Sequence, residues 1–311
     1  MAAAPPLRPA QDAIADHGGN AMIPLGIRIY GLGAIATGLV GLAWRDFALQ
    51  WEPVAASFPG RTALACIFAA LLIVAGAGMN WRRSSAALGA AALVGLYAVV
   101  VVLMHGVQIA QHPGAFAAWD GAAEQLALLA GGLASYACLA GAKTGVATDG
   151  GHGESPRDAL RAYAQLSRAA LIFMGLCLLM FGLAHFLYLD FTASFVPAWL
   201  PGGRKFWAVV TGAAHVAAGI ALLSGIKARL AASLLTVMFA TFSVLVHLPL
   251  LIADPHSHSN WVMNAINLAL TGAAWAIATA LAQTNTRHED LAAGVAGTNF
   301  PAEGIRQVRE S

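Results

Sequence analysis

Histidine and asparagine side chains occur inside strongly apolar segments in the second half of this sequence. His185, His215 and His247 lie in three different segments, and Asn264 and Asn267 lie in a fourth. Neutral imidazole can bind a metal, accept a hydrogen bond or relay a proton, and an amide can orient a bound ligand. Polar groups in hydrocarbon are costly unless they are paired, so these residues predict a shared internal site.

The composition indicates what surrounds these segments. The chain is 59% hydrophobic and only 10% charged, whereas a typical soluble domain has about 25% charged residues. We therefore expect an integral membrane protein with the lipid bilayer as its surroundings. The net charge of +2 argues against a nucleic-acid partner. The three cysteines form no Cys-x-x-Cys pair, so a thiol–disulfide function has no support.

Eight segments are long enough to cross a membrane, because a spanning helix needs about 20 mostly apolar residues. The predicted spans are residues 23–43, 62–80, 85–109, 122–142, 168–188, 206–225, 229–252 and 262–282. The sequence therefore predicts an all-α membrane protein with eight transmembrane helices.

Short motifs recur at an offset of about 142 residues, which indicates a duplication. Val102-Leu103-Met104-His105 recurs as Val244-Leu245-Val246-His247, and Gly41-Leu42-Ala43-Trp44 recurs as Gly182-Leu183-Ala184-His185. The predicted domains are an N-terminal tail (1–22), a first four-helix repeat (23–142), a linker (143–165), a second four-helix repeat (166–284) and a C-terminal tail (285–311). With four spans each, both repeats should insert the same way, as parallel repeats do.

The two repeats differ in their polar residues. The second carries histidines where the first has Trp44 and Leu72, so we expect a degenerate site in the first repeat and the working site in the second. Asp120 and Glu124 of the first repeat are interpreted as solvated charges at the start of a helix, the alternative being a small acidic rim.

Lysine and arginine predict the orientation. They concentrate on the side that holds both termini, and the other side holds only Arg45, Arg61, Arg204 and Lys205. The positive-inside rule then places both termini in the cytoplasm, in a multi-pass protein of the cytoplasmic (inner) membrane. The site residues fall at a similar depth near the extracytoplasmic face. The loop above them is expected to form a lid or entrance with Asp254, His256, His258 and Trp261.

Three interpretations of the site remain open. In one, His185, His215 and His247 ligate a metal or a haem iron. In another, the histidines and asparagines hydrogen-bond a quinone-like ligand and relay its protons. In the last, they only hydrogen-bond one another and the backbone between helices.

Three motifs of the second half resemble the DoxX/DoxD-like membrane proteins. They are Gly182-Leu183-Ala184-His185-Phe186, Val196-Pro197-Ala198-Trp199-Leu200-Pro201 and Thr211-Gly212-Ala213-Ala214-His215-Val216-Ala217-Ala218-Gly219. The resemblance covers roughly residues 168–282 well and residues 27–142 weakly, mostly through the internal repeat. His215 stands where the family usually has a glutamate, which puts in doubt any role carried over from that glutamate and concentrates imidazoles in one pocket.

The resemblance implies a compact four-helix unit and a link to sulfur and redox metabolism. The DoxD type looks like the membrane subunit of a thiosulfate:quinone oxidoreductase, and DoxX proteins are associated with membrane oxidoreductase complexes. We therefore expect a quinone-interacting redox subunit that works with a partner redox subunit, its own enzymatic activity being left open. The alternatives are a non-catalytic anchor or assembly subunit of an oxidoreductase complex, and a small-molecule or metal-ion permease.

Overall fold

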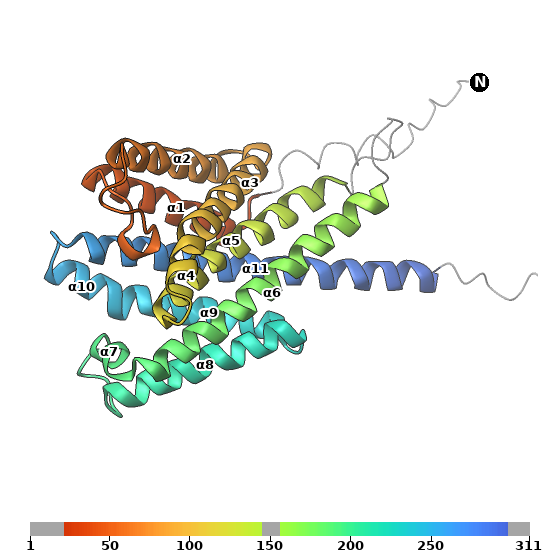
Figure 1. The fold of residues 1–311 in the computed structure, drawn as a ribbon. Coiled ribbons are helices and arrows are strands. Elements are labelled where there is room, and N and C mark those ends of the chain that lie inside the picture. The colour runs from red at the N-terminus through yellow and green to blue at the C-terminus, as the bar shows by residue number, and fades with distance from the viewer. Residues whose placement is uncertain (1–21, 145–155, 298–311) are drawn as a thin grey trace, which may run out of the picture.

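The computed structural model describes residues 22–144 and 156–297, and every regular element among them is helical. Eight long helical segments form one bundle (Figure 1). They are α1 (Leu25–Trp44), α2 (Arg61–Trp81), α3 (Arg83–Val99) continued by η2 (Val100–His105) and α4 (Gly106–Gln111), α5 (Phe116–Thr144), α6 (Pro156–Leu187), α8 (Arg204–Ser224), α9 (Ala228–Phe242) continued by η3 (Ser243–His247) and α10 (Leu248–Ala253), and α11 (His258–Gly297). Two short helices, η1 (Leu49–Trp51) and α7 (Leu189–Ser194), lie in loops.

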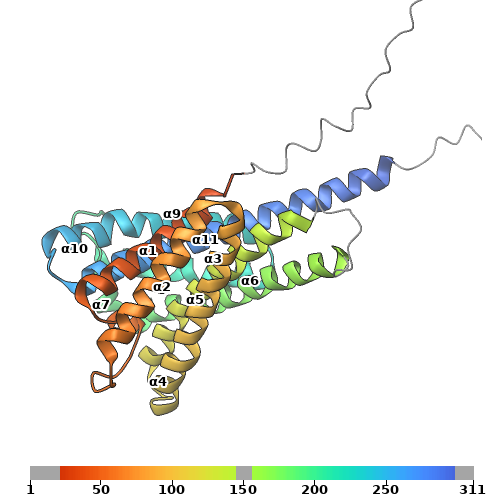
Figure 2. The same ribbon diagram turned by 90° about the horizontal axis from the view of Figure 1, so that it is seen from above.

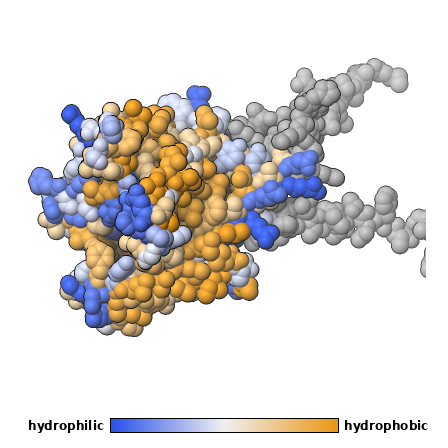
Figure 3. Space-filling model, viewed as in Figure 1, coloured by the Kyte–Doolittle hydropathy of each residue, from blue (hydrophilic) through white to orange (hydrophobic). Residues whose placement is uncertain are grey.

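All eight segments are long and apolar enough to cross a membrane, as the sequence predicts. The shortest, α1, has 20 residues, which at 1.5 Å per residue is about 30 Å, the thickness of a bilayer's hydrocarbon core. Large apolar side chains such as Val74, Leu88 and Val237 are more than 60% exposed. Figure 3 shows apolar residues covering the middle of one face, with hydrophilic residues at both ends.

Three helices extend by six residues or more beyond their predicted ends. Helix α6 begins at Pro156, inside the predicted linker 143–165, because proline is well tolerated in the first turn of a helix. Helix α5 begins at Phe116, and α11 continues to Gly297, inside the predicted tail 285–311. These extensions lie outside the continuous apolar segments, so apolar content alone predicts the helices too short. The remainder of both tails and of the linker lies outside the described residues.

The two ends of the bundle differ. At one end lie α7, α10 and the loops that connect α1 to α2, α4 to α5, α6 to α8 and α10 to α11 (Figures 1 and 2). At the other end, α5, α6 and α11 project beyond the bundle. We call the first of these the loop end, and it is the end at which all the candidate site residues lie.

Helices α5 and α11 form the core of the bundle. The apolar stretches of α5 and α11 are 78% and 72% buried, whereas that of the segment from α9 to α10 is 17% buried. They pack against each other; α11 also packs on α1 and α9, and α5 also packs on α3 and α6. The outer helices pack in sequence, α1 on α2, α2 on α3, α6 on α8 and α8 on α9.

Small residues allow α1 and α11 to touch along their backbones. A Cβ atom added at Gly272 of α11 would lie 2.2 Å from the backbone nitrogen of Tyr30 in α1. A Cβ atom at Gly33 of α1 would lie 2.4 Å from the Cα atom of Ala269. Close glycine contacts of this kind are typical of helices that associate in membranes, where there is no hydrophobic drive between them.

Two of the eight segments contain a π-helical turn, and both turns end at a histidine. Segment η2 ends at His105, and segment η3 ends at His247. Short π-helical insertions inside α-helices occur frequently at functional sites. The sequence repeat predicts that these two histidines correspond, but nothing in it predicts the π-helical turn.

Candidate functional site

A cavity of about 230 Å³ at the loop end contains three of the predicted histidines and one of the asparagines. We call it the histidine cavity. Its walls come from both halves of the chain, namely the η1 loop and α5 of the first half and six elements of the second, α6, α7, α8, α9, η3 and α11. It is lined by Trp51, Asp120, Glu124, Phe181, Ala184, His185, Phe191, Thr192, His215, Phe239, Phe242, His247, Met263, Ile266, Asn267 and Leu270.

His185 and His215 form a pair of rings across the α6–α8 contact, with centroids 5.0 Å apart. The Nδ1 atom of His185 lies 2.8 Å from the carbonyl oxygen of Phe181, and that of His215 lies 2.8 Å from the carbonyl oxygen of Thr211. A carbonyl oxygen only accepts, so each Nδ1 donates and each Nε2 of a neutral ring is an acceptor. Neither Nε2 atom hydrogen-bonds to any described residue, so the cavity wall holds two open acceptors.

Glycines bring these two rings together. A Cβ atom at Gly212 of α8 would lie 2.8 Å from the Cβ atom of His185. A Cβ atom at Gly182 of α6 would lie 2.8 Å from the carbonyl oxygen of Gly212. The sequence places these glycines on the same helix faces as the histidines, and the structure puts both faces in the α6–α8 contact.

Aromatic rings enclose His215, which is 2% exposed. Its ring centroid lies 5.9 Å from that of Phe181, 5.8 Å from that of Phe239 and 6.2 Å from that of Phe242. The cavity therefore combines flat apolar walls with a few polar atoms, which is the usual composition of a small-molecule site.

His247 and Asn267 close the side of the cavity formed by η3 and α11. The Nδ1 atom of His247 is buried and has no hydrogen-bond partner among the described residues. The Asn267 side-chain amide donates to the carbonyl oxygen of Phe239 (2.9 Å) and to the hydroxyl of Ser243 (2.6 Å). Asn267 thus connects two helices, and His247 is left with an unsatisfied nitrogen beside the cavity.

Two carboxylates from the first half also line the histidine cavity. Asp120 and Glu124 lie one turn apart on α5. The sequence predicts solvated charges at the start of a helix. In the structure both side chains instead line the cavity, because α5 packs on α6 and turns this face toward the second half. Their i, i+4 spacing places both on one helix face, but it does not show which helix that face meets.

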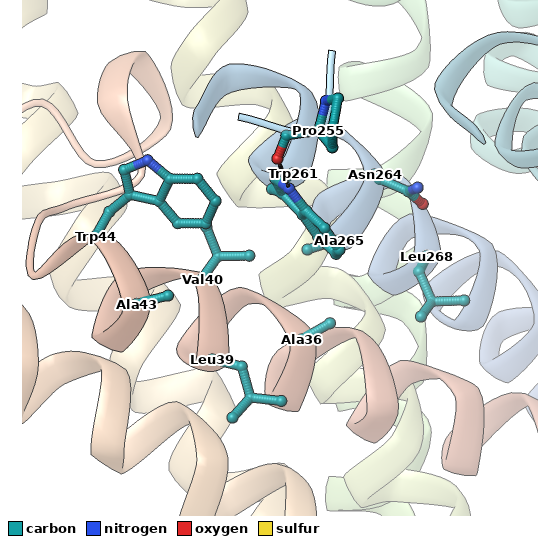
Figure 4. A pocket seen from close by; sticks show the side chains of 10 residues that line it. All are labelled: Ala36, Leu39, Val40, Ala43, Trp44, Pro255, Trp261, Asn264, Ala265 and Leu268. Carbon is teal, nitrogen blue, oxygen red and sulfur yellow. Dashed lines mark hydrogen bonds between the residues drawn. The ribbon is translucent and has the colours of Figure 1, made fainter. Parts of the chain in front are cut away.

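Asn264 lies outside the histidine cavity, contrary to the predicted grouping. It lines a separate pocket of about 510 Å³ between α1 and α11, together with Trp44, Pro255 and Trp261 (Figure 4). Helix α11 packs between α1 and α9. Asn264 lies on the side of α11 toward α1, whereas Asn267, three residues further on, lies on the side toward α9 and the histidine cavity. The Trp261 indole nitrogen donates to the carbonyl oxygen of Pro255 (2.9 Å).

The predicted lid residues do not line the histidine cavity either. Asp254 and His256 lie in the exposed loop before α11, where the Asp254 carboxylate accepts a hydrogen bond from the His256 backbone N–H (3.2 Å). His258 stacks on Trp44, with ring centroids 4.9 Å apart and planes 7° apart. These residues therefore surround the loop-end contact between α1 and α11.

The corresponding part of the first half is filled by its own loop. Phe47, Trp51 and Glu52 are all buried there. The Nε2 atom of His105 lies 3.1 Å from the carbonyl oxygen of Trp51, so this nitrogen donates and is satisfied. In the matching loop of the second half, Ala193 is the only buried residue among positions 188–200. This difference in side-chain volume explains why the histidines of the second half face a cavity.

The cavity fits some of the predicted ligands better than others. Among the described residues, no group of three His, Cys, Asp or Glu side chains is arranged to hold a metal ion. Sites for whole drug-sized ligands start at about 300 Å³, so a cavity of about 230 Å³ is small for haem and suits one ring-sized group. A quinone head group has this size, and the hydroxyls of its quinol form can donate to the open Nε2 acceptors of the wall.

We expect Asn267→Ala to destabilise the fold by about 1 kcal/mol, because polar contacts between membrane helices average about 0.6 kcal/mol and Asn267 makes two. The unfolding of purified protein in detergent measures this. Thr279→Ala is the control, since the Thr279 hydroxyl bonds only within α11, to the carbonyl oxygen of Trp275. Equal stability of both variants would contradict a role for Asn267 in joining α9 and α11.

The fold and the cavity together define a class: an all-helical protein with eight helices able to span a membrane and a small internal polar site. Within this class, residues 174–282 match a protein family described as a domain of unknown function, DUF8561. The matched segment runs from α6 to α11 and includes His185, His215 and His247. No curated protein and no solved structure matches the chain.

Proposed function

We propose that this protein is a quinone-interacting redox subunit of the cytoplasmic membrane, with the histidine cavity as its quinone site. The observation that supports this most is the set of unsatisfied polar atoms in a ring-sized cavity. The Nε2 atoms of His185 and His215 are acceptors, and the Nδ1 atom of His247 has no partner among the described residues. Buried polar groups without partners, of which the Nδ1 atom of His247 is one, are rare in folded proteins and call for an explanation, which a bound ligand supplies.

The residues of the cavity would have different roles in binding the ligand. The neutral rings of His185 and His215 accept hydrogen bonds from ligand hydroxyls, and His247 supplies a further polar contact. Phe181, Phe239 and Phe242 are rings on which the head group can stack. A quinone supplies two-electron redox chemistry when bound, and we propose that its electrons are exchanged with a partner redox subunit.

We further propose that the two halves are parallel, fused DoxX-like four-helix repeats. In support, α1 packs on α11 as α6 packs on α5, and α1 packs on α2 as α6 packs on α8. Each half has a π-helical turn that ends at a histidine. Trp119 donates to the carbonyl oxygen of Pro113 (3.0 Å), as Trp261 does to that of Pro255.

The orientation belongs to the same proposal. The basic residues on the side of the termini support a cytoplasmic location for both ends of the chain. The loop end would then face the extracytoplasmic side, and the head group would enter the cavity from the outer leaflet. The rest of a quinone would stay in the bilayer, because the cavity has room only for a ring.

The proposal is tested by titrating decylubiquinol, the reduced form whose hydroxyls can donate to the Nε2 acceptors, into the purified protein and following tryptophan fluorescence, which Trp51 in the cavity wall can report. His215→Phe keeps an aromatic ring among the phenylalanines but removes the acceptor. We expect its Kd to rise at least tenfold, about 1.4 kcal/mol. His256→Phe, in the exposed loop, is the matched control and should bind as the wild type does.

An absence of binding to the wild type, or an equal Kd for His215→Phe, would contradict a quinone site here. The histidines would then serve only as contacts between helices, and a non-catalytic membrane anchor or assembly subunit would be the function to pursue.

A further inference from the structure

Asp120 and Glu124 are two acidic groups in the histidine cavity that lack a charged partner. The ion pairs among the described residues involve other carboxylates, those of Asp46, Asp158 and Asp190. Two like charges one helical turn apart destabilise a helix, and an unpaired charge inside an apolar bundle costs more. Such a pair is tolerated most easily if at least one of the two carboxyls carries a proton. A carboxyl that carries a proton in a cavity can donate that proton to a ligand.

Their positions on α5 form a short path. Asp120 is the fifth residue of the helix and is partly exposed at the loop end. Glu124 lies four residues further along, about 6 Å deeper at 1.5 Å per residue. The same cavity wall holds the Nε2 acceptors of His185 on α6 and His215 on α8. The other titratable groups around this path are His247 on η3 and His105 on η2, the latter beside Gly121.

We propose that Asp120 and Glu124 form a proton relay between the loop end and the ligand in the histidine cavity. This inference rests on the proposed quinone function. Reduction of a quinone to a quinol takes up two electrons, here from the proposed partner redox subunit, and two protons, one on each carbonyl oxygen. For each proton, Asp120 takes it from water and passes it to Glu124, directly or through water in the cavity.

The proton then leaves the Glu124 carboxyl for an Nε2 atom of the histidine pair. The new N–H bond breaks as an O–H bond forms on the ligand oxygen, and the imidazole returns to its neutral state. Oxidation of a quinol runs the same steps in reverse. The first half of the chain would thus supply the acids, and the second half would supply the groups that contact the ligand.

The test uses purified protein with decylubiquinone, an electrode as the electron source and infrared difference spectroscopy as the readout. Reduction in the wild type should change the C=O stretching band of a protonated carboxyl. Glu124→Gln should lose this change, bind decylubiquinone with a Kd within about threefold of the wild type, and slow reduction by about 100-fold, the usual scale of acid–base assistance. Asp120→Asn should slow reduction and keep the band.

Glu52→Gln is the matched control, because Glu52 is a buried carboxyl that does not line the cavity. It should keep both the band change and the rate. If Glu124→Gln keeps them as well, the relay is wrong while the quinone site stands. If Glu124→Gln abolishes binding, Glu124 is a ligand-binding residue and the relay is likewise wrong. If the wild type binds no decylubiquinone, the proposed function itself fails.

Discussion

Gly272→Ala is expected to destabilise the bundle by about 3 kcal/mol or more, the upper part of the range for overpacked cores. The added Cβ atom would lie 2.2 Å from the backbone nitrogen of Tyr30 and 2.4 Å from its Cα atom. The backbone of Tyr30 cannot rotate away as a flexible side chain could, so α1 and α11 must separate. Their contact is one of the two most extensive in the molecule, and its loss would expose much of the core.

Unfolding in detergent, followed by circular dichroism, measures this effect. The matched control is Gly95→Ala in α3, where an added Cβ atom would meet nothing within 4 Å. That variant should be neutral or slightly stabilised, since alanine is favoured over glycine in helices by about 1 kcal/mol. If Gly272→Ala proved as stable as Gly95→Ala, the described backbone contact between α1 and α11 would be wrong.

Glu52→Gln should remove a pH dependence of stability. Burial raises the pKa of the Glu52 carboxyl from 4.5 to about 7, with a smaller contribution from the Asp46 carboxylate and an opposing one from the Ala48 N–H that it accepts at 2.9 Å. The folded state therefore holds this proton more tightly than the unfolded state. Its stabilising contribution is complete below pH 4.5 and is lost as the pH rises to about 7.

The size of this contribution is about 3 kcal/mol, at about 1.4 kcal/mol for each unit of pKa. Glutamine keeps an oxygen that can accept from the Ala48 N–H but does not ionise. Thermal unfolding of both proteins across this pH range is the measurement. Glu52→Gln should gain stability relative to the wild type as the pH rises, while groups common to both cancel. A constant difference between the two would mean that Glu52 titrates normally.

The eight helices could be predicted from the sequence because the length of an apolar segment is a local property. Their ends could not be predicted as well. Pro156 begins α6 within a stretch that reads as a linker, and α11 continues past its apolar part. The π-helical turns before His105 and His247 also have no signal in the pattern of apolar residues.

The candidate site was predictable where it depends on one half of the chain. Gly182, His185, Gly212 and His215 share helix faces by spacing, and the structure brings them into one contact. The carboxylates of Asp120 and Glu124 depend on how α5 packs against α6, which no local pattern encodes. The prediction that Asn264 shares the site fails for the same reason, since only the packing of α11 decides which face of that helix meets the cavity.

The exchange of helix partners between the halves has an evolutionary consequence. Helix α1 of the first half packs on α11 of the second, and α6 of the second packs on α5 of the first, so each half completes the other. On the proposed repeat, an ancestral four-helix subunit would have paired with an identical copy, and every substitution would have appeared in both sites. Fusion into one chain released that constraint. One site could then be lost to Trp51 and Glu52 while its neighbouring helix specialised in serving the other.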